Sequence, residues 1–325
     1  MSDKSQIISE ALYLLNIGEE VDPAILKKAF DRILSGHDVH ARDVQLGALL
    51  TGLMVRGPTV EEIVVLLESS FQLDGFSPYE GVSIDLPNDE KLVGAIGSGK
   101  KGIKTMNVTT PALIVAATAG AYTAKSVSSS TSSLTGSADF LHGVGVNLGI
   151  PMEAMRDVIL KTGFGAYSIE SLVPRFVEVY GGKFFVPHAL SFGLAALISP
   201  IPYDELLYGL AHPDIETSTK VLKRFGLSDV MVVSSTHDNV HYIDELGIFG
   251  TSDISIMKDS EIGDLTTIEP KKVFGLPDYT PRDIAQGRNL ADNIKYSVDV
   301  LRGKGEPARE DLVCANAGAI LVLAG

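Results

Sequence analysis

The sequence has a single cysteine, Cys314, so it cannot form an internal disulfide bond. This residue lies in an apolar run near the carboxyl end, and we expect it to be a buried structural thiol. The amino terminus also lacks the basic start and the continuous apolar core of a signal peptide. These absences allow a reducing compartment, and we expect a cytoplasmic protein.

Cations are scarce relative to acids. Lysine plus arginine number 27 and aspartate plus glutamate number 41, which gives a net charge of -14. Nucleic-acid surfaces need clustered cations, so we do not expect a nucleic-acid partner. The balance still allows a small cationic pocket for a phosphorylated substrate. At 325 residues, of which 45% are hydrophobic, the chain is long enough for one large domain and a smaller one.

Two stretches contain no charged residue and reach the length of a membrane-spanning helix, residues 105–124 and 184–203. The first carries Asn107, several threonines and Pro111, and the second carries His188 and three prolines. Polar groups and prolines suit a membrane poorly, so we expect buried segments of an α/β core and no membrane contact. We expect His188 to be a hydrogen-bonded core residue rather than a base.

Apolar residues recur at helical spacing through about the first 70 residues. Asp22, followed by a proline, is typical of a helix start, and Thr59 with Glu62 has the pattern of a capping box. Four short helices this close together predict a small all-helical domain, to which we assign residues 1–72.

Beyond a connection rich in proline and glycine at about residues 75–90, apolar runs alternate with helical patterns. This alternation predicts an α/β domain over residues 75–162 and 188–325, with a central mixed sheet flanked by helices. Residues 163–187 have an ambiguous pattern. The terminal helix is almost wholly apolar, so we expect it to be buried. The predicted strands are residues 92–96, 205–211 and 230–234, and the predicted helices are residues 151–162, 214–225, 280–302 and 310–324.

A glycine-rich turn follows the first predicted strand. Gly97, Ser98 and Gly99 end the apolar run of residues 92–96. Glycines allow positive φ and bring backbone N–H groups close to a ligand, so this turn suits an anion. Polar side chains then stand where the next helix begins, where they can cap the helix while its dipole favours negative charge. These residues are Asn107, Thr109 and Thr110.

A second polar turn leads to the following helix. An apolar run ends at Lys125, a serine-rich loop covers residues 126–135, and Gly136, Ser137 and Asp139 mark the next helix start. Two such turns are typical of a phosphate site at the carboxyl edge of an α/β sheet. Simpler interpretations stay open: turns without a ligand, a solvated lysine at a strand end, and threonines that only cap a helix.

Two adjacent acids, Asp244 and Glu245, follow the predicted strand at residues 230–234. Mg²⁺ prefers a few carboxylates together with water and phosphate oxygens, so this pair suits a magnesium site beside a phosphate. Solvated surface carboxylates are the alternative. His237 and His241 lie in the same loop and, with Asp244, resemble a zinc site, although two ordinary loop histidines or oligomer contacts explain them better.

The order and spacing of these motifs resemble the phosphoribosyl-diphosphate site of the anthranilate phosphoribosyltransferases, the glycosyltransferase family shared with pyrimidine nucleoside phosphorylases. The resemblance covers nearly the full chain. It implies an enzyme that uses Mg²⁺ to transfer a phosphoribosyl group from phosphoribosyl diphosphate to a nitrogen acceptor, anthranilate or a related aromatic amine, as in tryptophan biosynthesis. It also implies that residues 163–187 return to the helical domain and that two copies form a homodimer through that domain.

The resemblance also implies roles for individual residues. No strong general base is required, because catalysis of this transfer depends on stabilising the departing diphosphate and holding the acceptor in line. The glycine turn would offer its N–H groups to the diphosphate, Lys125 would add a fixed positive charge, and Thr109, Asp244 and Glu245 would bind Mg²⁺. The residues that would bind the substrate are Gly97, Ser98, Gly99, Lys100, Asn107, Thr109, Thr110, Lys125 and Ser137.

The sequence also departs from the family pattern. The family's first loop runs Gly-Thr-Gly-Gly-Asp-Gly, and here Lys100 and Lys101 replace a glycine and the aspartate. The segment that normally carries the anthranilate-binding arginine contains none, and Arg175 is the nearest candidate. These changes leave two alternatives open: a nucleoside or nucleotide phosphorylase, and a non-catalytic member that acts as a binding protein.

Overall fold

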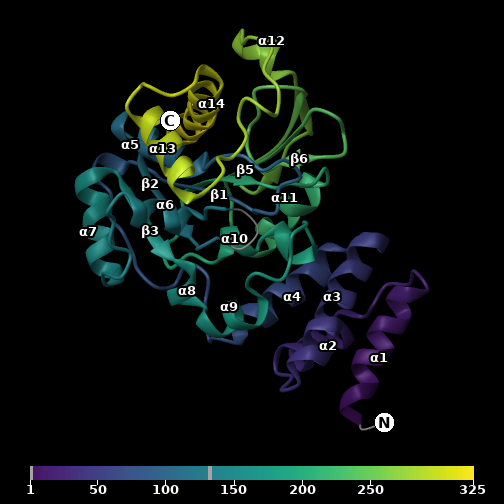
Figure 1. Cartoon of the computed structure of the whole chain (residues 1–325). Coiled ribbons are helices and arrows are strands. Elements are labelled where there is room, and N and C mark those ends of the chain that lie inside the picture. Colours follow the sequence, from purple (N-terminus) through teal and green to yellow (C-terminus); the bar gives the residue numbers. More distant parts are fainter. Residues whose placement is uncertain (1–2, 131–133) are drawn as a thin grey trace.

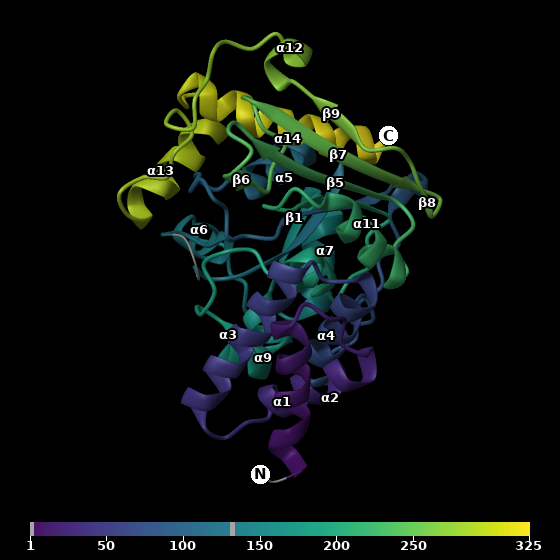
Figure 2. The ribbon, with the colours of Figure 1, turned by 90° about the vertical axis from the view of Figure 1, so that its right-hand side faces the viewer.

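The computed structural model describes residues 3–130 and 134–325. Residues 1–2 of the predicted helical domain and residues 131–133 of the second polar turn lie outside the described residues. The chain forms a bundle of helices at one end and a sheet covered by helices at the other (Figure 1). The two ends of the chain lie at opposite ends of the molecule (Figure 2).

The helical bundle follows the start signals in the sequence. Asp22 Oδ1 accepts a hydrogen bond from the Ala24 N–H at 2.9 Å, and Asp38 Oδ1 accepts one from the Ala41 N–H at 3.1 Å. Each bond satisfies a backbone donor that the first turn of a helix leaves without a partner. The four predicted helices are confirmed. They are α1 (Asp3–Asn16), α2 (Pro23–Leu34), α3 (Val39–Arg56) and α4 (Val60–Gln72).

The predicted capping box at the start of α4 is also confirmed. Thr59 Oγ1 accepts from the Glu62 N–H at 3.2 Å, and Glu62 Oε2 accepts from the Thr59 N–H at 2.8 Å. The buried Glu62 carboxylate also accepts from the Val21 N–H at 3.2 Å and pairs with Arg56. The cap therefore ties the start of α4 to the end of α3 and to the chain before α2.

Thr59→Ala is expected to lower the free energy of unfolding by about 1 kcal/mol, because the Glu62 N–H loses its acceptor. Urea unfolding followed by circular dichroism measures the change. Thr59→Ser retains the hydroxyl and should stay close to the wild type. Equal unfolding midpoints for the wild type and Thr59→Ala would contradict the stabilising role of the cap.

Among the described residues, nine strands form one sheet in the order β3-β2-β1-β4-β5-β7-β8, with β6 paired to β5 and β9 to β7. The strands from β3 to β5 are parallel, and β7 is antiparallel to β5, so the predicted mixed sheet is confirmed. Parallel strands are buried on both faces, which explains their continuous apolar runs. The strands are β1 (Leu92–Gly97), β2 (Tyr122–Val127), β3 (Phe164–Ser168), β4 (Glu205–Gly209), β5 (Val230–Thr236), β6 (Tyr242–Ile243), β7 (Thr251–Lys258), β8 (Glu261–Ile262) and β9 (Thr266–Ile268).

Helices cover both faces of the sheet (Figures 1 and 2). Val93 and Ala95 of β1 pack in one cluster with α5 and α14, whereas Leu206 and Tyr208 of β4 belong to the core on the other face. This division follows from the alternation of side chains along a strand. The remaining helices are α5 (Thr109–Thr118), α6 (Ser137–Gly143), α7 (Met152–Thr162), α8 (Ile169–Leu172), α9 (Pro174–Tyr180), α10 (Leu194–Leu197), α11 (Ile215–Arg224), α12 (Pro270–Phe274), α13 (Leu290–Leu301), α14 (Pro307–Ala324) and the 3₁₀ turns η1 (Pro87–Asp89) and η2 (Ala189–Phe192).

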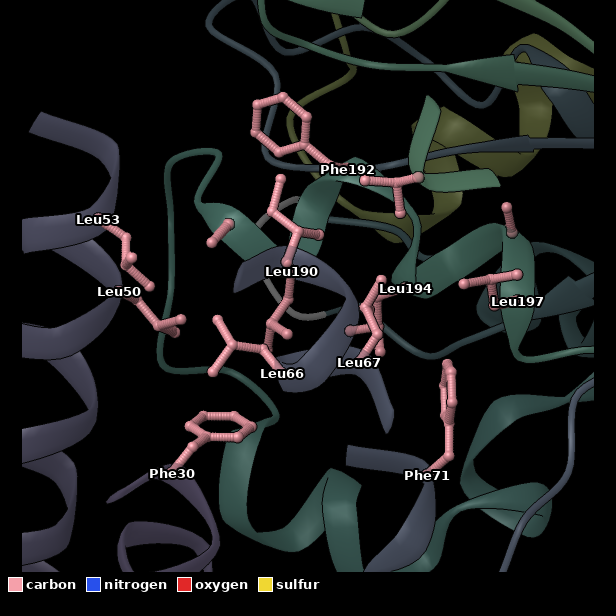
Figure 3. Close-up of a cluster of buried hydrophobic side chains, with 14 of the residues drawn as sticks. Phe30, Leu50, Leu53, Leu66, Leu67, Phe71, Leu190, Phe192, Leu194 and Leu197 are labelled. Atoms are coloured by element: carbon pink, nitrogen blue, oxygen red, sulfur yellow. The ribbon is translucent and has the colours of Figure 1, made fainter. Parts of the chain in front are cut away.

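One hydrophobic cluster joins the bundle to the sheet (Figure 3). The charge-free stretch of residues 184–203 contributes η2 and α10 to this cluster, so its middle part is buried as predicted. Among residues 3–130 and 134–325, no helix has the length and apolar character needed to cross a membrane. The labelled side chains are Phe30, Leu50, Leu53, Leu66, Leu67 and Phe71 from the bundle, and Leu190, Phe192, Leu194 and Leu197 from the stretch.

The helix predicted at residues 280–302 is shorter in the structure, where only α13 is helical. Asn289 has extended backbone, and its side chain accepts from the Asp292 N–H at 2.9 Å. Asn293 Oδ1 accepts from the Gly287 N–H at 2.7 Å. These bonds start the helix at residue 290, and the residues before it form turns.

The prediction that residues 163–187 all join the helical domain is wrong for residues 164–168. These residues form β3 and pair with β2 at the edge of the sheet. The following α9 does lie near the bundle, because Asp74, just beyond α4, accepts from the N–H groups of Arg175 and Phe176, both at 2.8 Å. The division into domains stays a prediction.

The terminal helix α14 is buried on one face only, which corrects two predictions. Leu312 and Ile320 pack against the sheet, whereas Cys314, Gly318 and Val322 are exposed. Residues spaced by four share one face of a helix, so the exposed residues form a stripe, and this stripe lines an open groove together with residues of β5, β7 and β9. The cysteine is therefore not a buried structural thiol.

Candidate functional site

Loops that follow β1, β2 and β6 meet around one cavity, which we call the polar cavity. Ser98 instead lines an adjoining cavity, the apolar cavity, which shares Gly97, Lys100 and Lys125 with the first. The structure therefore brings the predicted residues together, and their roles stay predictions. The predicted residues that line the polar cavity are Gly97, Gly99, Lys100, Asn107, Thr109, Thr110, Lys125, Ser137, Asp244 and Glu245.

The glycine turn after β1 uses two of its N–H groups internally. The Ser98 N–H donates to the carbonyl oxygen of Gly209 at 2.8 Å, and the Gly99 N–H donates to Asp244 Oδ2 at 2.6 Å. Gly99 and Lys100 have positive φ, +70° and +58°, so the turn has the expected left-handed backbone. The prediction that these two N–H groups face a diphosphate is wrong, because neighbouring segments already occupy them.

Two glycines let the loop with the acids approach the sheet. A Cβ on Gly97 would lie 2.3 Å from Asp244 Oδ2, and a Cβ on Gly209 would lie 1.7 Å from the Asp244 carbonyl oxygen. These glycines end the neighbouring strands β1 and β4, where they are register partners. Glycine at both positions thus fixes the place of the acid pair at the sheet edge.

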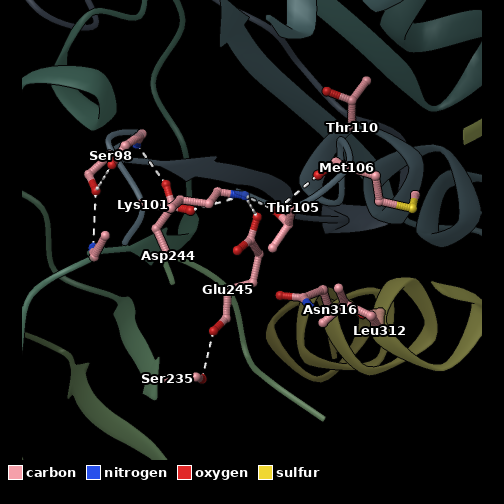
Figure 4. Close-up of polar contacts among 12 residues, drawn as sticks. Ser98, Lys101, Thr105, Met106, Thr110, Ser235, Asp244, Glu245, Leu312 and Asn316 are labelled. Atoms are coloured by element: carbon pink, nitrogen blue, oxygen red, sulfur yellow. Dashed lines mark hydrogen bonds and ion pairs between the residues drawn. The ribbon is translucent and has the colours of Figure 1, made fainter. Parts of the chain in front are cut away.

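Lys101 lies against both acids (Figure 4). Its Nζ lies 3.3 Å from Asp244 Oδ1, pairs with Glu245 Oε1, and donates to Thr105 Oγ1 at 2.6 Å. Both carboxylates are buried, so the alternative of solvated surface acids is wrong. Lys101 was not among the predicted site residues, although its replacement of the family's aspartate was visible in the sequence.

Burial and neighbouring charges shift the pKa values of Lys101 and Glu245 in opposite directions. Burial alone would lower the pKa of Lys101, but the carboxylates of Asp244 and Glu245 outweigh it and raise that pKa. Burial raises the pKa of Glu245, and the neighbouring Lys101 ammonium opposes the rise. The arrangement therefore keeps Lys101 charged.

Lys125 lies at the centre of the polar cavity wall, on β2. It is buried, and its Nζ donates to Thr110 Oγ1 at 3.2 Å. Burial lowers the pKa of Lys125 to about 8. The alternative of a solvated lysine is therefore wrong. Capping by the threonines is wrong as well, because α5 begins after Val108 without a side-chain cap.

Residues 128–130 of the serine-rich loop lie against the start of α6. Asp139 Oδ2 accepts from the N–H groups of Ser130 and Gly136, both at 2.8 Å. The Ser128 N–H donates to Ser137 Oγ at 3.4 Å. Small residues are needed here, since a Cβ on Gly136 would lie 2.3 Å from the Ser128 carbonyl oxygen. Residues 128–130 and Thr135 thereby add hydroxyl groups to the lining of the polar cavity.

Unpaired donors also face the polar cavity. The buried Lys104 Nζ and Asn107 Nδ2 have no hydrogen-bond partner among the described residues. Burial lowers the pKa of Lys104, with the nearby Lys101 acting in the same direction. Buried donors without partners are rare in proteins, so an anion with several acceptor oxygens would complete this site. Lys104 was missed at the sequence level because its spacing from the glycine turn indicates no orientation.

The lining of the apolar cavity includes the rings of Phe176 and Tyr180 of α9 and the aliphatic side chain of Leu194 of α10. Tyr180 Oη hydrogen-bonds His188 Nε2 at 2.9 Å, and burial lowers the pKa of His188, which confirms a hydrogen-bonded core histidine. Lys100 Nζ lies 5.2 Å from the centroid of the Tyr180 ring. A flat ring fits between such walls.

Two further candidates lie elsewhere. The Arg175 guanidinium donates to the Leu73 carbonyl oxygen at 2.7 Å, and Arg175 lines neither cavity, so it is not the missing acceptor arginine. His241 Nδ1 lies 2.7 Å from Asp238 Oδ2, whereas Asp244 faces Lys101. The zinc-like grouping is therefore wrong, and the described residues contain no cluster of three or more metal-ligating side chains.

Comparison with known proteins identifies relatives over most of the chain. The model of the a/b domain of a glycosyl transferase family matches residues 89–325. The anthranilate phosphoribosyltransferase of Polynucleobacter necessarius is 31% identical over 288 residues, which cover 86% of this chain and 78% of that protein. That of Deinococcus radiodurans is 30% identical over 284 residues, 87% of this chain and 80% of that protein.

Solved structures show the same fold. The anthranilate phosphoribosyltransferase of Thermus thermophilus superposes with a TM-score of 0.74 at 23% identity, covering 97% of this chain and 89% of that one. The Saccharomyces cerevisiae enzyme in complex with PRPP and Mg has a TM-score of 0.75 at 18% identity, with 98% and 89% coverage. The α/β class with an added helical bundle is thus shared with both.

Proposed function

This chain belongs to the glycosyl transferase family that includes the anthranilate phosphoribosyltransferases and is therefore a glycosyltransferase enzyme, and we propose that it transfers a phosphoribosyl group from phosphoribosyl diphosphate to a nitrogen acceptor. One observation carries the proposal. Within the part of the chain that the structure describes, Lys104 and Lys125 line one cavity without a carboxylate hydrogen-bonded to either ammonium, and the Asn107 amide donor beside them has no partner. Such a group of donors matches the oxygens of a diphosphate.

The proposed reaction separates positive from negative charge, and the cationic side chains of the polar cavity can stabilise the negative part. As the bond from the sugar to the diphosphate breaks, positive charge grows on the sugar and negative charge on the leaving group. Lys125, fixed against Thr110, stabilises the departing diphosphate without having to move. Ser128 and Ser137 add hydroxyl donors at the same cavity. The chain thus lowers the barrier by electrostatic stabilisation and positioning, with no strong base.

The acceptor enters through the apolar cavity, which adjoins the polar cavity at Gly97 and Lys125. The Phe176 and Tyr180 rings favour a flat aromatic amine. No arginine lines this cavity among the described residues, so a carboxylate on the acceptor would meet Lys100 without a bidentate partner. Anthranilate and related aromatic amines are the proposed acceptors, and the phosphorylase and the binding protein remain the alternatives.

The Mg²⁺ of the yeast complex needs ligands, and Asp244, Glu245 and Thr109 have oxygen atoms of the right kind. The arrangement of the acids does not fit a directly bound metal, because the Lys101 ammonium contacts both carboxylates. No step of the proposed reaction therefore depends on a metal. Mg²⁺ bound by this chain stays a prediction.

Two predictions about the whole protein also belong to this proposal. Exposed apolar side chains on α1 and α3 support a homodimer through the helical bundle, among them Tyr13, Val44 and Val55. A cytoplasmic location and the division between residues 1–72 and the α/β part stay predictions.

Calorimetric titration with phosphoribosyl diphosphate tests the proposed function. We expect a dissociation constant between about 1 μM and 1 mM, the usual range for enzyme substrates. Lys104→Met should weaken binding about tenfold, because a charged donor is lost. Lys295→Met removes the same charge from an exposed side chain of α13 that lines neither cavity, and it should leave the affinity unchanged.

The same protein then separates the alternatives. Release of diphosphate with any of a panel of aromatic amines supports the transferase. Binding of a nucleoside together with inorganic phosphate, and none of phosphoribosyl diphosphate, identifies a phosphorylase. Binding of phosphoribosyl diphosphate without turnover of any amine favours the binding protein.

A further inference from the structure

We propose that the Lys101 ammonium takes the place of a divalent cation at the Asp244–Glu245 pair, so that these acids bind no metal in this chain. The inference rests on the proposed function where it concerns phosphoribosyl diphosphate. It is based on the contacts of the Lys101 side chain. Lys101 is the residue that replaces the family's aspartate.

The partners of the Lys101 ammonium are oxygen atoms of the kind that bind Mg²⁺ in proteins. Its Nζ contacts a carboxylate oxygen of Asp244 and one of Glu245, together with the hydroxyl of Thr105. Hard cations are held by such oxygens. An ammonium has three N–H donors, of which two donate to Glu245 Oε1 and Thr105 Oγ1, while Asp244 Oδ1 lies within ion-pair distance. The lysine therefore has the place and the coordination of a bound cation.

The remaining carboxylate oxygens leave little for a metal. Asp244 Oδ2 accepts from the Gly99 N–H at 2.6 Å, while Oδ1 faces Lys101 at 3.3 Å. Asp244 Oδ1 and Glu245 Oε2 are buried without a hydrogen-bond partner among the described residues, and of these two only Oδ1 lies within ion-pair distance of Lys101. Among the oxygens of the two acids, Glu245 Oε2 is thus the one that contacts neither Lys101 nor the Gly99 N–H in the described part of the chain. Any metal bound through the others would have to displace the lysine or the Gly99 N–H.

The backbone fixes Lys101 in this position. The next residue, Gly102, donates its N–H to the Tyr242 carbonyl oxygen at 2.8 Å. A Cβ on Gly102 would lie 2.9 Å from the Cα of His241, so the two loops touch closely. The loop that carries the lysine is therefore held against the loop that carries the acids. Because the Lys101 ammonium is part of the folded chain, its contact with the acids does not require the loss of translational entropy that accompanies binding of a free ion.

The charge of the site supports the same conclusion. The ammonium groups of Lys101 and the nearby Lys125 already supply two positive charges to the acid pair, so a divalent ion would add two more. Lys101 lines the polar cavity together with Lys104 and Lys125. Their three ammonium groups supply the positive charge for a diphosphate that a metal supplies elsewhere.

Binding of Mn²⁺ alone, measured by the electron paramagnetic resonance signal of the free ion, tests the proposal without any substrate. We expect weak or no binding to the wild type. Lys101→Met should bind at least about tenfold more tightly, because a positive charge leaves the pair and frees its oxygens. Asp244→Asn in the Lys101→Met background should abolish the gain. Lys100→Met removes an equal charge from the same loop without freeing the acids and should show no gain.

Equal Mn²⁺ affinity of the wild type and Lys101→Met would overturn the proposal, as would a gain that survives Asp244→Asn. Circular dichroism checks each fold. If Lys101→Met does not fold, Lys101→Gln replaces it, since the amide keeps a donor for Glu245 without the charge.

A second measurement uses phosphoribosyl diphosphate, with EDTA or with Mg²⁺ present. The affinity of the wild type should differ by less than about threefold between the two conditions, and that of Lys101→Met by about tenfold or more. A wild type that loses its affinity in EDTA contradicts the proposal. A wild type that binds in neither condition contradicts the proposed function instead, and the Mn²⁺ titration then decides the role of Lys101 alone.

Discussion

Lys125→Met is expected to lower kcat/KM for phosphoribosyl transfer by about 100-fold or more, the usual effect of losing a fixed charge that stabilises a leaving group. Lys125 is buried in the cavity wall with Thr110 as its hydrogen-bond partner, so its ammonium is held in one place. Methionine keeps the length of the aliphatic stem. Steady-state assays of diphosphate release, with the best acceptor from the panel, measure the change.

Although Lys125→Met should lose activity, its free energy of unfolding should be higher than that of the wild type. Burial lowers the pKa of Lys125 to about 8 in the folded protein, so at neutral pH the fold holds a charged group that prefers water. At pH 7 we expect Lys125→Met to be more stable than the wild type by about 1 to 3 kcal/mol.

The pH dependence of this difference has a definite sign. Between about pH 8 and pH 10.5 the unfolded chain binds more protons at Lys125 than the folded one, so the wild type gains stability as pH rises. In urea unfolding, the difference in the free energy of unfolding between Lys125→Met and the wild type should therefore decrease from about pH 8 to pH 10.5. Lys161→Met, on the exposed side of α7, should change neither activity nor its pH profile. Full activity of Lys125→Met would disprove its role in the transfer.

Gly209→Ala is expected to destabilise the protein by more than about 3 kcal/mol and to abolish activity. The new Cβ would lie 1.7 Å from the carbonyl oxygen of Asp244, and a backbone atom cannot move aside as a flexible side chain can. The acid loop must then leave the edge of the sheet, and Lys101 loses its partners. Urea unfolding and the diphosphate-release assay measure both effects.

Gly318→Ala is the matched control for this substitution. Gly318 lies in α14, and a Cβ there meets nothing within 4 Å. Alanine has the better helix propensity, so this variant should be more stable than the wild type by about 0.5 to 1 kcal/mol. A Gly209→Ala protein with wild-type stability would show that the acid loop is free to shift, and the fixed position of Asp244 would then be refuted.

Local signals made most of the fold predictable. The capping box of Thr59 and Glu62 and the cap at Asp22 involve residues within one turn of each other, so their geometry follows from the sequence alone. The apolar runs of β1 and β5 mark strands because both faces of these strands are buried. The residues that line the polar cavity could be predicted to lie together, because the loops after parallel strands meet at one edge of a sheet.

Contacts between distant segments were not predictable in the same way. Lys101 and Glu245 are 144 residues apart, and no local pattern indicates that their side chains meet. The free N–H groups expected at Ser98 and Gly99 were lost for the same reason, since their acceptors lie on other strands and loops. At residues 280–302 the apolar period continued across Asn289, but a side-chain cap there outweighed the period.

The hydrophobic cluster shared by the bundle and the sheet also reaches the apolar cavity, the proposed acceptor site. Leu194 packs in that cluster and also lines the apolar cavity, while Leu67 of α4 belongs to the same cluster. Protein interiors are close to incompressible. A displacement of α4 must therefore change the width of the cavity, so acceptor preference can be altered by substitutions in the bundle that never touch the acceptor.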